Sequence, residues 1–131
     1  MKLHLTTTTD KQLFTGYGYE GDLSWVEVNK KRYAQSLIVL PDELITDWQV
    51  AEFNSLNEAS FELIAKLYTV QFKLEVVLLG TGKTHLFAHP RLSRCLTDAG
   101  ISVEYMTTDA ACRTYNFLMA EGRAVAAALI I

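Results

Sequence analysis

Apolar residues occur along this chain in two patterns, uninterrupted runs and helical spacings. The runs Ser36–Leu40, Glu75–Leu79 and Val125–Ile131 do not alternate with polar residues, which is typical of strands covered on both faces. A further strand is expected over Ile101–Tyr105. Helical spacings separate the runs, so the pattern predicts a sheet with helices packed on it.

Three helices are expected between these strands. Ser55 and Glu58 have capping-box spacing and predict a helix to about Tyr68, with an apolar face formed by Leu56, Ala59, Leu63, Ile64 and Leu67. Pro90 suits the first turn of a short helix that Gly100 ends, with an apolar stripe formed by Leu92, Cys95, Leu96 and Ala99. The third helix begins at Thr107 or Thr108 and ends at Gly122.

The N-terminal third is expected to be rich in strands. Trp25–Val28 and Arg32–Leu40 flank Asn29-Lys30-Lys31, which suits a hairpin turn. The fold class is therefore α/β: one compact domain over residues 1–131, with a central mixed sheet, packed helices and an N-terminal β-hairpin. We expect the strands near 36–40, 75–79 and 101–105 to run parallel because helices connect them. The direction of the last strand is left open.

Composition and charge narrow the function classes. The 131 residues carry a net charge of −3, which disfavours a nucleic-acid partner. No apolar run approaches the ~20 residues of a membrane span, and Met1–Asp10 lacks the apolar region of a signal peptide. Two cysteines without a tight pairing motif fit a reducing compartment. We therefore expect a cytoplasmic protein without membrane insertion, either a monomer or a weak homo-oligomer.

Two glycine-rich strings resemble nucleotide-binding motifs. Gly16–Gly21 matches the dinucleotide pattern, but a strand is expected after it where that motif requires a helix, so a glycine-rich turn is the better interpretation. Gly80–Thr84 ends in Gly-Lys-Thr as a phosphate-binding loop does. The glycine that the full motif requires is replaced by Val77, and Pro90 places the next helix too late, which disfavours an NTPase.

Other residues with chemical potential are weighed against structural roles. His85 and His89 have i, i+4 spacing, but they lie in an expected loop without a third ligand nearby, so no metal is expected. Cys95 is interpreted as a buried apolar residue. The helix dipole and the neighbouring guanidinium favour a thiolate at Cys112, yet structural packing is the favoured role. Arg113 either pairs with Asp109 or receives an anionic group.

From Leu78 onward the sequence resembles a known family. The strings that carry the resemblance are Leu79-Gly80-Thr81-Gly82, Ala110-Ala111-Cys112-Arg113-Thr114-Tyr115-Asn116 and Glu121-Gly122-Arg123. They resemble an uncharacterised domain family, the domain of unknown function four-nine-eight, which includes a mitochondrial complex I assembly factor and an adipogenesis-associated protein. One departure is Ala88, which follows Phe87 where the family usually has proline.

The resemblance implies a compact α/β fold with a central mixed sheet and no established catalytic activity. No cofactor is expected. A non-catalytic interaction or assembly-factor module with a protein partner is therefore favoured. The alternative is a small-molecule or anion-binding protein, or an enzyme, that uses the crevice at the carboxyl edge of the sheet. The resemblance also implies that Arg123 is a position of the family motif. The candidate ligand-binding residues are Gly80, Thr81, Gly82, Thr107, Thr108, Cys112, Arg113 and Asn116.

Overall fold

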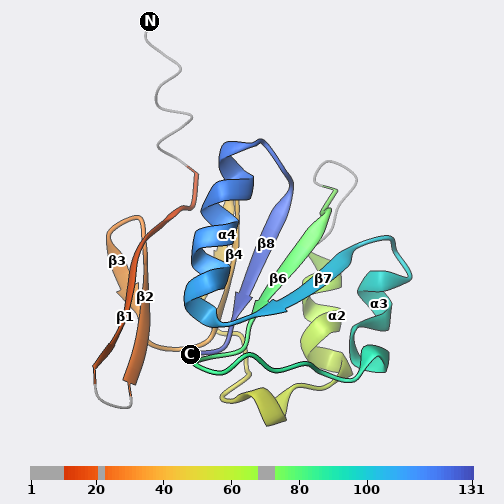
Figure 1. Ribbon diagram of the computed structural model, residues 1–131. Coiled ribbons are helices and arrows are strands. Elements are labelled where there is room, and N and C mark those ends of the chain that lie inside the picture. The colour runs from red at the N-terminus through yellow and green to blue at the C-terminus, as the bar shows by residue number, and fades with distance from the viewer. Residues whose placement is uncertain (1–10, 21–22, 68–72) are drawn as a thin grey trace, which may run out of the picture.

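The computed structural model describes residues 11–20, 23–67 and 73–131 and contains two sheets (Figure 1). The small sheet is antiparallel and has the order β1-β2-β3, formed by β1 (Phe14–Glu20), β2 (Leu23–Val28) and β3 (Lys31–Tyr33). The large sheet has the order β5-β4-β8-β6-β7, formed by β4 (Leu37–Leu40), β5 (Glu43–Ile45), β6 (Val76–Gly80), β7 (Ser102–Met106) and β8 (Val125–Leu129). This arrangement confirms the predicted α/β class with a mixed central sheet and an N-terminal hairpin.

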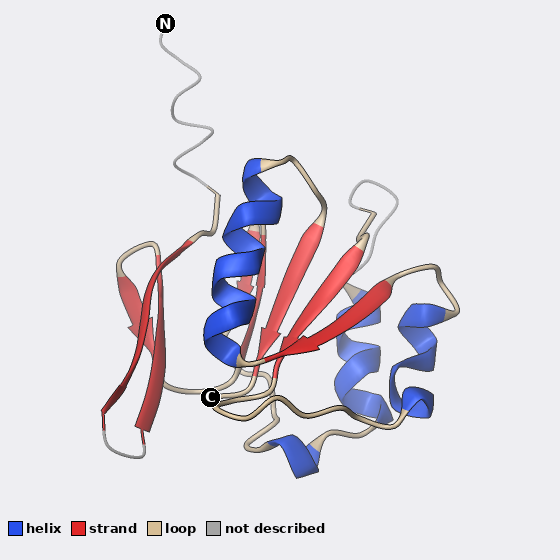
Figure 2. Ribbon diagram, in the orientation of Figure 1, coloured by secondary structure: helices blue, strands red, loops and turns tan. Residues whose placement is uncertain are grey.

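Helices cover both faces of the large sheet (Figure 2). α4 (Thr108–Ala120) lies on one face, while α2 (Glu58–Lys66) and the continuous pair η2 (Pro90–Ser93) and α3 (Arg94–Thr97) lie on the other. A short helix, η1 (Phe53–Ser55), precedes α2. The strands β4, β6 and β8 are buried at every residue because both of their faces are covered, as their uninterrupted apolar runs predict.

The sheet separates two apolar clusters. On the α2 and α3 side, Phe61, Ile64 and Leu96 pack against alternate residues of β4, β6 and β8. On the α4 side, the remaining alternate residues meet Ala111, Cys112 and Tyr115. Phe14, Val26 and Val28 of the small sheet join the second cluster. The small sheet is therefore attached to the core through α4, beside which it lies in Figure 1.

The expectation that β4 runs parallel to β6 is wrong. β4 is antiparallel to β8, whereas β6 is parallel to both β7 and β8. The cause is β5, which the sequence analysis missed: it pairs antiparallel with β4 and reverses the chain before α2. The helical crossover therefore starts from β5 and not from β4. The last strand, whose direction was left open, runs parallel to β6.

The segment Arg32–Leu40, expected as one strand, is divided between two sheets. β3 ends at Tyr33 and β4 begins at Leu37. The turn before β3 agrees with the prediction, since Asn29 and Lys30 have φ values of 48° and 74°, the left-handed conformation of a tight hairpin.

The first glycine string is a strand and not the expected turn. Residues 14–20 form β1, and Gly21 lies outside the described residues. A Cβ atom at Gly18 would lie 2.6 Å from Cζ2 of Trp25, so the glycine makes room for the indole ring of the neighbouring strand. The strand β2 follows the string, as the argument against dinucleotide binding requires.

The helices α2 and α3 differ in detail from the sequence analysis. α2 is capped by Asn57 and Ser60 instead of Ser55 and Glu58, and Tyr68 lies outside the described residues. Leu63 is exposed, whereas Phe61 is fully buried. Cys95 is exposed and not buried, because the preceding turn is a 3-10 helix, whose different twist shifts the apolar face toward Leu96.

Candidate functional site

The carboxyl ends of β6, β7 and β8 lie at the same edge of the large sheet, because the three strands are parallel. The loop at Gly80–Gly82 leaves β6 there, and α4 begins there directly after β7. The structure thus brings together Gly80, Thr81, Gly82, Thr107 and Thr108. This is the edge at which open α/β sheets bind ligands.

Hydrogen bonds within the chain join these segments. The Thr108 N–H donates to the carbonyl of Gly82 at 2.9 Å, and the Gly82 N–H donates to Oγ1 of Thr108 at 2.9 Å. The Thr108 hydroxyl donates to the Ile130 carbonyl at 2.9 Å, and the Ile130 N–H donates to the Gly80 carbonyl at 2.9 Å. We call Gly80, Gly82, Thr108 and Ile130 the edge lock. Its N–H groups are paired internally and do not point freely toward a ligand.

Close packing accompanies these bonds at Gly80. A Cβ atom at this position would lie 2.8 Å from Cδ2 of Leu129 and 3.0 Å from Cα of Thr108. The glycine therefore allows the first turn of α4 to approach the end of β6. A small residue is needed here for packing, whether or not the edge binds a ligand.

Thr81 shapes the loop that follows. Its N–H donates to the Met106 carbonyl at 2.8 Å, and its buried hydroxyl lies 2.6 Å from the Thr84 carbonyl. The Leu86 N–H donates to the same hydroxyl at 3.3 Å. No helix begins at Lys83 or Thr84 in this part of the described chain, so the geometry of a phosphate-binding loop is not formed.

At the start of α4, Thr107 occupies the N-cap position with an extended backbone. A hydrogen bond from its side chain holds the pKa of Asp109 below the ordinary value, with a further contribution from Arg113. The carboxylate of Asp109 also suits the N-terminal end of the helix dipole. The polar side chains of this helix start therefore stabilise one another.

The remaining candidate residues lie farther along α4 and face the small sheet. Asn116 binds both main-chain groups of Phe14: its Oδ1 accepts from the N–H at 2.9 Å, and its Nδ2 donates to the carbonyl at 2.7 Å. The Tyr115 hydroxyl donates to the Gln12 carbonyl at 2.9 Å, and its ring packs edge-on against Phe14. We call Tyr115 and Asn116 the strand clamp, because they hold β1 on α4.

Cys112 lies on α4 between Thr108 of the edge lock and Tyr115 of the strand clamp, and it is 1% exposed. Burial raises the pKa of its thiol to about 12, and the nearby carboxylate of Asp109 contributes in the same direction. The thiolate considered from the helix dipole and the guanidinium is therefore disfavoured at neutral pH. Cys112 packs as an apolar residue in the cluster below α4.

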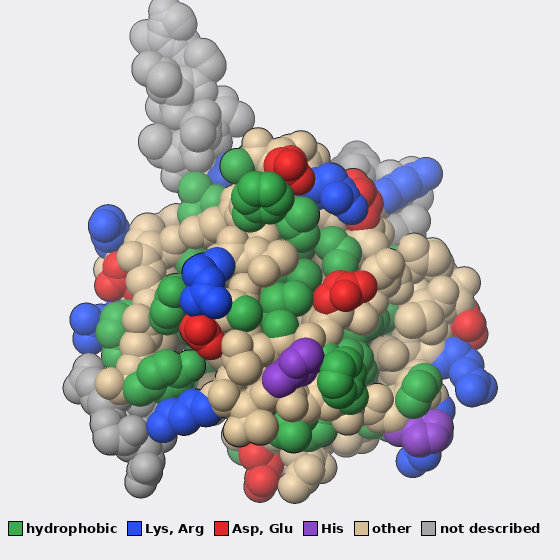
Figure 3. Space-filling view, viewed as in Figure 1, with side chains coloured by type: hydrophobic (Ala, Val, Ile, Leu, Met, Phe, Trp, Pro, Cys, Tyr) green, Lys and Arg blue, Asp and Glu red, His purple; other side chains and the backbone are tan. Residues whose placement is uncertain are grey.

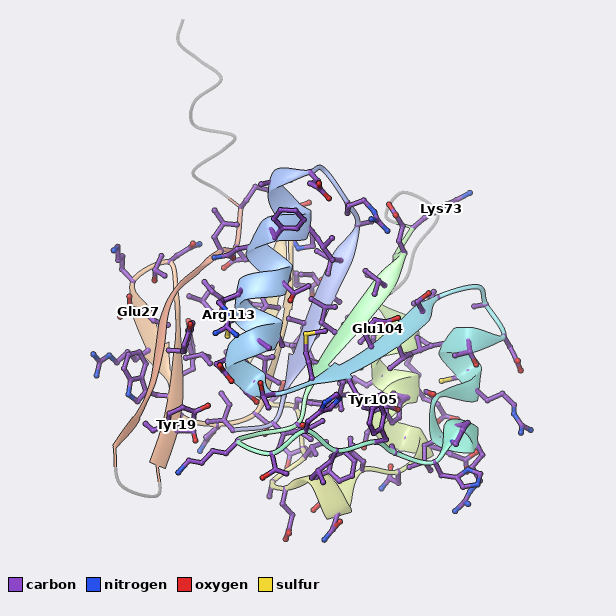
Figure 4. All side chains as sticks on the ribbon, viewed as in Figure 1. Tyr19, Glu27, Lys73, Glu104, Tyr105 and Arg113 are labelled. Carbon is purple, nitrogen blue, oxygen red and sulfur yellow. The ribbon has the colours of Figure 1, made fainter. Side chains whose placement is uncertain are left out.

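Arg113 has two partners. Its Nη1 lies 3.0 Å from Oδ2 of Asp109 and donates to the Tyr17 hydroxyl at 2.8 Å. The ion pair that the sequence analysis proposed is present, and Tyr17 is an additional partner from β1. Figure 4 shows Arg113 on the side of α4 that faces the small sheet. A role for Arg113 in binding an external anion stays a prediction.

Two grooves are notable among the described residues. The smaller, of about 220 Å³, lies between β1 and α4 and is lined in part by Tyr17, Cys112, Arg113 and Asn116. Its volume is below the roughly 300 Å³ at which small-molecule sites begin. The larger, of about 520 Å³, lies around Trp48 and contains none of the predicted site residues.

The two histidines of the i, i+4 pair have separate environments. The Arg91 N–H donates to Nδ1 of His89, which thereby caps η2. The ring of His85 lies tilted against that of Phe87, with the ring centroids 4.6 Å apart. No group of three or more potential metal-ligating side chains occurs within residues 11–20, 23–67 and 73–131.

Aromatic and cationic side chains are exposed around the carboxyl edge (Figure 3). Phe87 is 71% exposed and Tyr19 is 44% exposed. The ammonium group of Lys83 lies 5.1 Å from the centroid of the Tyr19 ring. We call Tyr19, Lys83, Phe87 and Arg113 the edge surface. Tyr19 and Phe87 were not predicted as surface residues from the sequence, although an aromatic residue between the two loop histidines was a usable signal.

Comparison with known proteins agrees with the motifs at this edge. A family model described as a protein of unknown function (DUF498/DUF598) matches residues 19–130. The chain belongs to the DUF498/DUF598 family. The edge lock and the strand clamp thus lie within the family region, and the resemblance stated from the sequence is confirmed.

Among the curated relatives of this chain, a Bos taurus protein named NADH dehydrogenase [ubiquinone] 1 alpha subcomplex assembly factor 3 is 35% identical over 79% of this chain and 54% of its own length. A Francisella tularensis protein named 13 kDa major membrane protein is 39% identical over 71% of this chain and 73% of its own length. The chain spans about half the length of the assembly factors that it matches.

A crystal structure of a Bordetella parapertussis protein shares the fold. The two chains are 35% identical and superpose with a TM-score of 0.80. The superposition covers 92% of this chain and 95% of the other.

Within the described residues, every helix is too short or too polar to cross a membrane.

Proposed function

We propose that this chain is a non-catalytic protein-interaction module of the assembly-factor type, which contacts its partner through the edge surface. The observation that carries the proposal is the contrast at the carboxyl edge. The main-chain N–H groups of Gly82 and Thr108 are paired within the protein, while Tyr19 and Phe87 are exposed beside them. Hydrogen-bonded loops that present exposed aromatic and cationic side chains are suited to protein contacts.

The composition of the edge surface supports this function. Tyrosine and arginine are enriched among residues that dominate binding energy, and phenylalanine is enriched in interfaces generally. Arg113 and Lys83 are each placed beside a tyrosine ring, at 5.7 Å from Tyr17 and 5.1 Å from Tyr19. Such placement reduces the side-chain entropy that a partner would otherwise have to remove.

The relatives named as assembly factors support the same function, because an assembly factor acts by binding other proteins. The cytoplasm is the compartment that we propose, because both cysteines carry free thiols. We propose that the chain is a monomer and that it binds a different protein.

The alternative function, binding of a small anion in the crevice by Gly80–Gly82, Thr107, Thr108 and Arg113, stays a prediction. A ligand there would have to compete with the hydrogen bonds of the edge lock. The phosphate titration described in the Discussion separates the two functions.

A photo-crosslinking pair tests the interaction function. The residue p-benzoylphenylalanine replaces Phe87 in the edge surface or Phe117 on α4, which is 63% exposed and serves as the matched control. After irradiation in cells of the native host, we expect a discrete protein adduct from position 87 and only background adducts from position 117. Equal adduct patterns from the two positions would contradict the proposal.

A further inference from the structure

The edges of the two sheets differ in how far they are protected. β3 and β5 are each three residues long, and Lys31 and Arg32 of β3 are exposed. β1 is bulged between Phe14 and Gly16 and is held against α4. Short length, charged side chains, proline and bulges are features by which proteins prevent edge strands from pairing with other chains.

β7 has one of these features, the exposed charged side chain of Glu104. It is five residues long, it keeps a regular parallel register with β6 from Ser102 to Met106, and it contains no proline, lysine or arginine. No described strand lies beyond it in the large sheet, and Figure 1 shows it as the outermost strand. β7 is therefore the edge that is best suited to accept a further strand.

The direction of its free main-chain groups follows from the bonds to β6 and its flanks. The Ser102 N–H donates to the Glu75 carbonyl at 3.1 Å, and the Met106 carbonyl accepts from Thr81 at 2.8 Å. Since alternate residues of a strand direct their main-chain groups to opposite edges, the N–H and C=O groups of Val103 and Tyr105 point away from β6. Within the described residues, no main-chain hydrogen bond satisfies these four groups.

We propose that the outer edge of β7 binds an extended segment of the partner protein by strand addition. The proposal rests on the proposed interaction function and names the kind of segment bound. Main-chain groups of Val103 and Tyr105 supply a donor and an acceptor each, which is the pattern that an added strand satisfies. The occupant is thus a stretch of extended polypeptide and not a helix.

Side chains beside this edge define the chemistry of the segment. Glu104 is exposed and lies on β7 on the face that carries α4 (Figure 4). An added strand with lysine or arginine opposite Glu104 gains a favourable cross-strand pair. The exposed ring of Phe87, whose centroid is 5.8 Å from that of Tyr105, offers an apolar contact at the carboxyl end of β7. The segment is therefore basic and partly apolar.

Charge argues against a second copy of this chain as the occupant. A symmetric antiparallel pair of β7 strands in full register would centre on Glu104 and place the two Glu104 carboxylates opposite each other. Like charges directly opposite in a sheet are destabilising. A different protein with a basic segment avoids this repulsion.

The test uses a displayed library of random peptides of about nine residues, longer than a typical strand, selected against the full chain. We expect enrichment of peptides that alternate apolar residues with lysine or arginine. Their synthetic versions should shift the amide resonances of Val103 and Tyr105. Val103→Pro removes one outward donor and leaves the bonds to β6 intact, so affinity should fall by about tenfold or more.

Glu104→Lys is the second variant and keeps the test decisive if Val103→Pro does not fold. A selection against Glu104→Lys should enrich aspartate and glutamate in place of lysine and arginine. Absence of enriched peptides, or equal binding to wild type and both variants, would overturn the proposal. So would a concentration-dependent dimer of the free chain that Val103→Pro abolishes, because the occupant would then be a second copy.

The two proposals fail separately. Adducts from position 87 without any effect of Val103→Pro or Glu104→Lys would retain the interaction function and reject strand addition. Peptide binding at β7 without adducts from position 87 would retain the binding edge and reject the edge surface as the partner contact.

Discussion

The edge lock and the strand clamp use similar polar residues of α4 for different purposes. The edge lock joins segments of the large sheet and its covering helix, with Thr108 bonded to Gly82 and Ile130. The strand clamp joins α4 to a separate sheet, with Asn116 bonded to Phe14 and Tyr115 bonded to Gln12. The first belongs to the central core and the second attaches a peripheral unit.

The structural roles of the edge lock and the strand clamp explain why their residues resemble a ligand-binding site in the sequence. Both groups satisfy main-chain N–H and C=O groups that would otherwise lie unpaired in partly or fully buried positions. The glycine and threonine residues of the edge lock and the asparagine of the strand clamp are therefore explained by their structural roles. The exposed residues beside it, and not the cluster itself, are the better candidates for binding.

The largest effect is expected from Thr108→Val, which keeps the shape of the side chain and removes its hydroxyl. The Gly82 N–H and the Ile130 carbonyl lose their partner at a position that is 4% exposed. We expect the free energy of unfolding to fall by about 3 kcal/mol, measured by urea denaturation. The loss should be global, with faster amide exchange in β6 and β8.

Thr107→Val is the matched control, because it makes the same replacement one residue earlier, where the hydroxyl bonds only to Asp109 among the interactions described. Its effect should stay within about 1 kcal/mol. Equal losses from the two variants would mean that the edge lock contributes no more than an ordinary helix cap.

Asn116→Ala tests the strand clamp. It leaves both main-chain groups of Phe14 without their partner, and we expect a loss of about 2 kcal/mol. Because the small sheet meets the core through α4, the loss should be local. Native-state hydrogen exchange should accelerate in β1 and β2 while β6 stays protected. Uniform acceleration in both sheets would remove the distinction between lock and clamp.

The same contrast sets the limit of prediction from sequence. Long apolar runs revealed β4, β6 and β8, because strands covered on both faces cannot be polar. β5 was missed because three partly exposed residues leave no periodic signal, and its absence led to the wrong direction for β4. β1 was missed because its glycines, which make room for Trp25, imitate a turn.

The candidate site shows a similar division. Parallel strands placed Gly80 and Thr108 at the same edge, and topology alone predicted this meeting. The partners of Tyr115 and Asn116 lie 103 and 102 residues away in the chain, and no local pattern links them. Cys95 became exposed because a 3-10 turn shifted the helix face, which apolar spacing does not reveal.

A smaller, pH-dependent effect is expected from Glu75→Gln at the opposite end of β6. The hydrogen bond from Arg123, together with the Ala124 N–H, holds the pKa of Glu75 below its ordinary value of 4.5. A lowered pKa stabilises the folded state above pH 4.5, and this stabilisation disappears as the pH falls through the folded value. The thermal midpoints of wild type and variant should therefore converge on acidification. When Arg123→Gln is also present, the difference in thermal midpoint between chains with and without Glu75→Gln should depend less on pH.

The smallest effect is expected from Arg113→Ala, which also separates anion binding from protein binding. Its pair with Asp109 is partly exposed to solvent, with side-chain exposures of 57% and 29%, so the thermal midpoint should change less than in Thr108→Val or Asn116→Ala. Titration of the wild-type chain with millimolar inorganic phosphate should give no saturable amide shifts at Gly80–Gly82, because the N–H groups of Thr81 and Gly82 are already bonded within the chain. Saturable shifts there, abolished by Arg113→Ala in a folded variant, would establish the anion site instead.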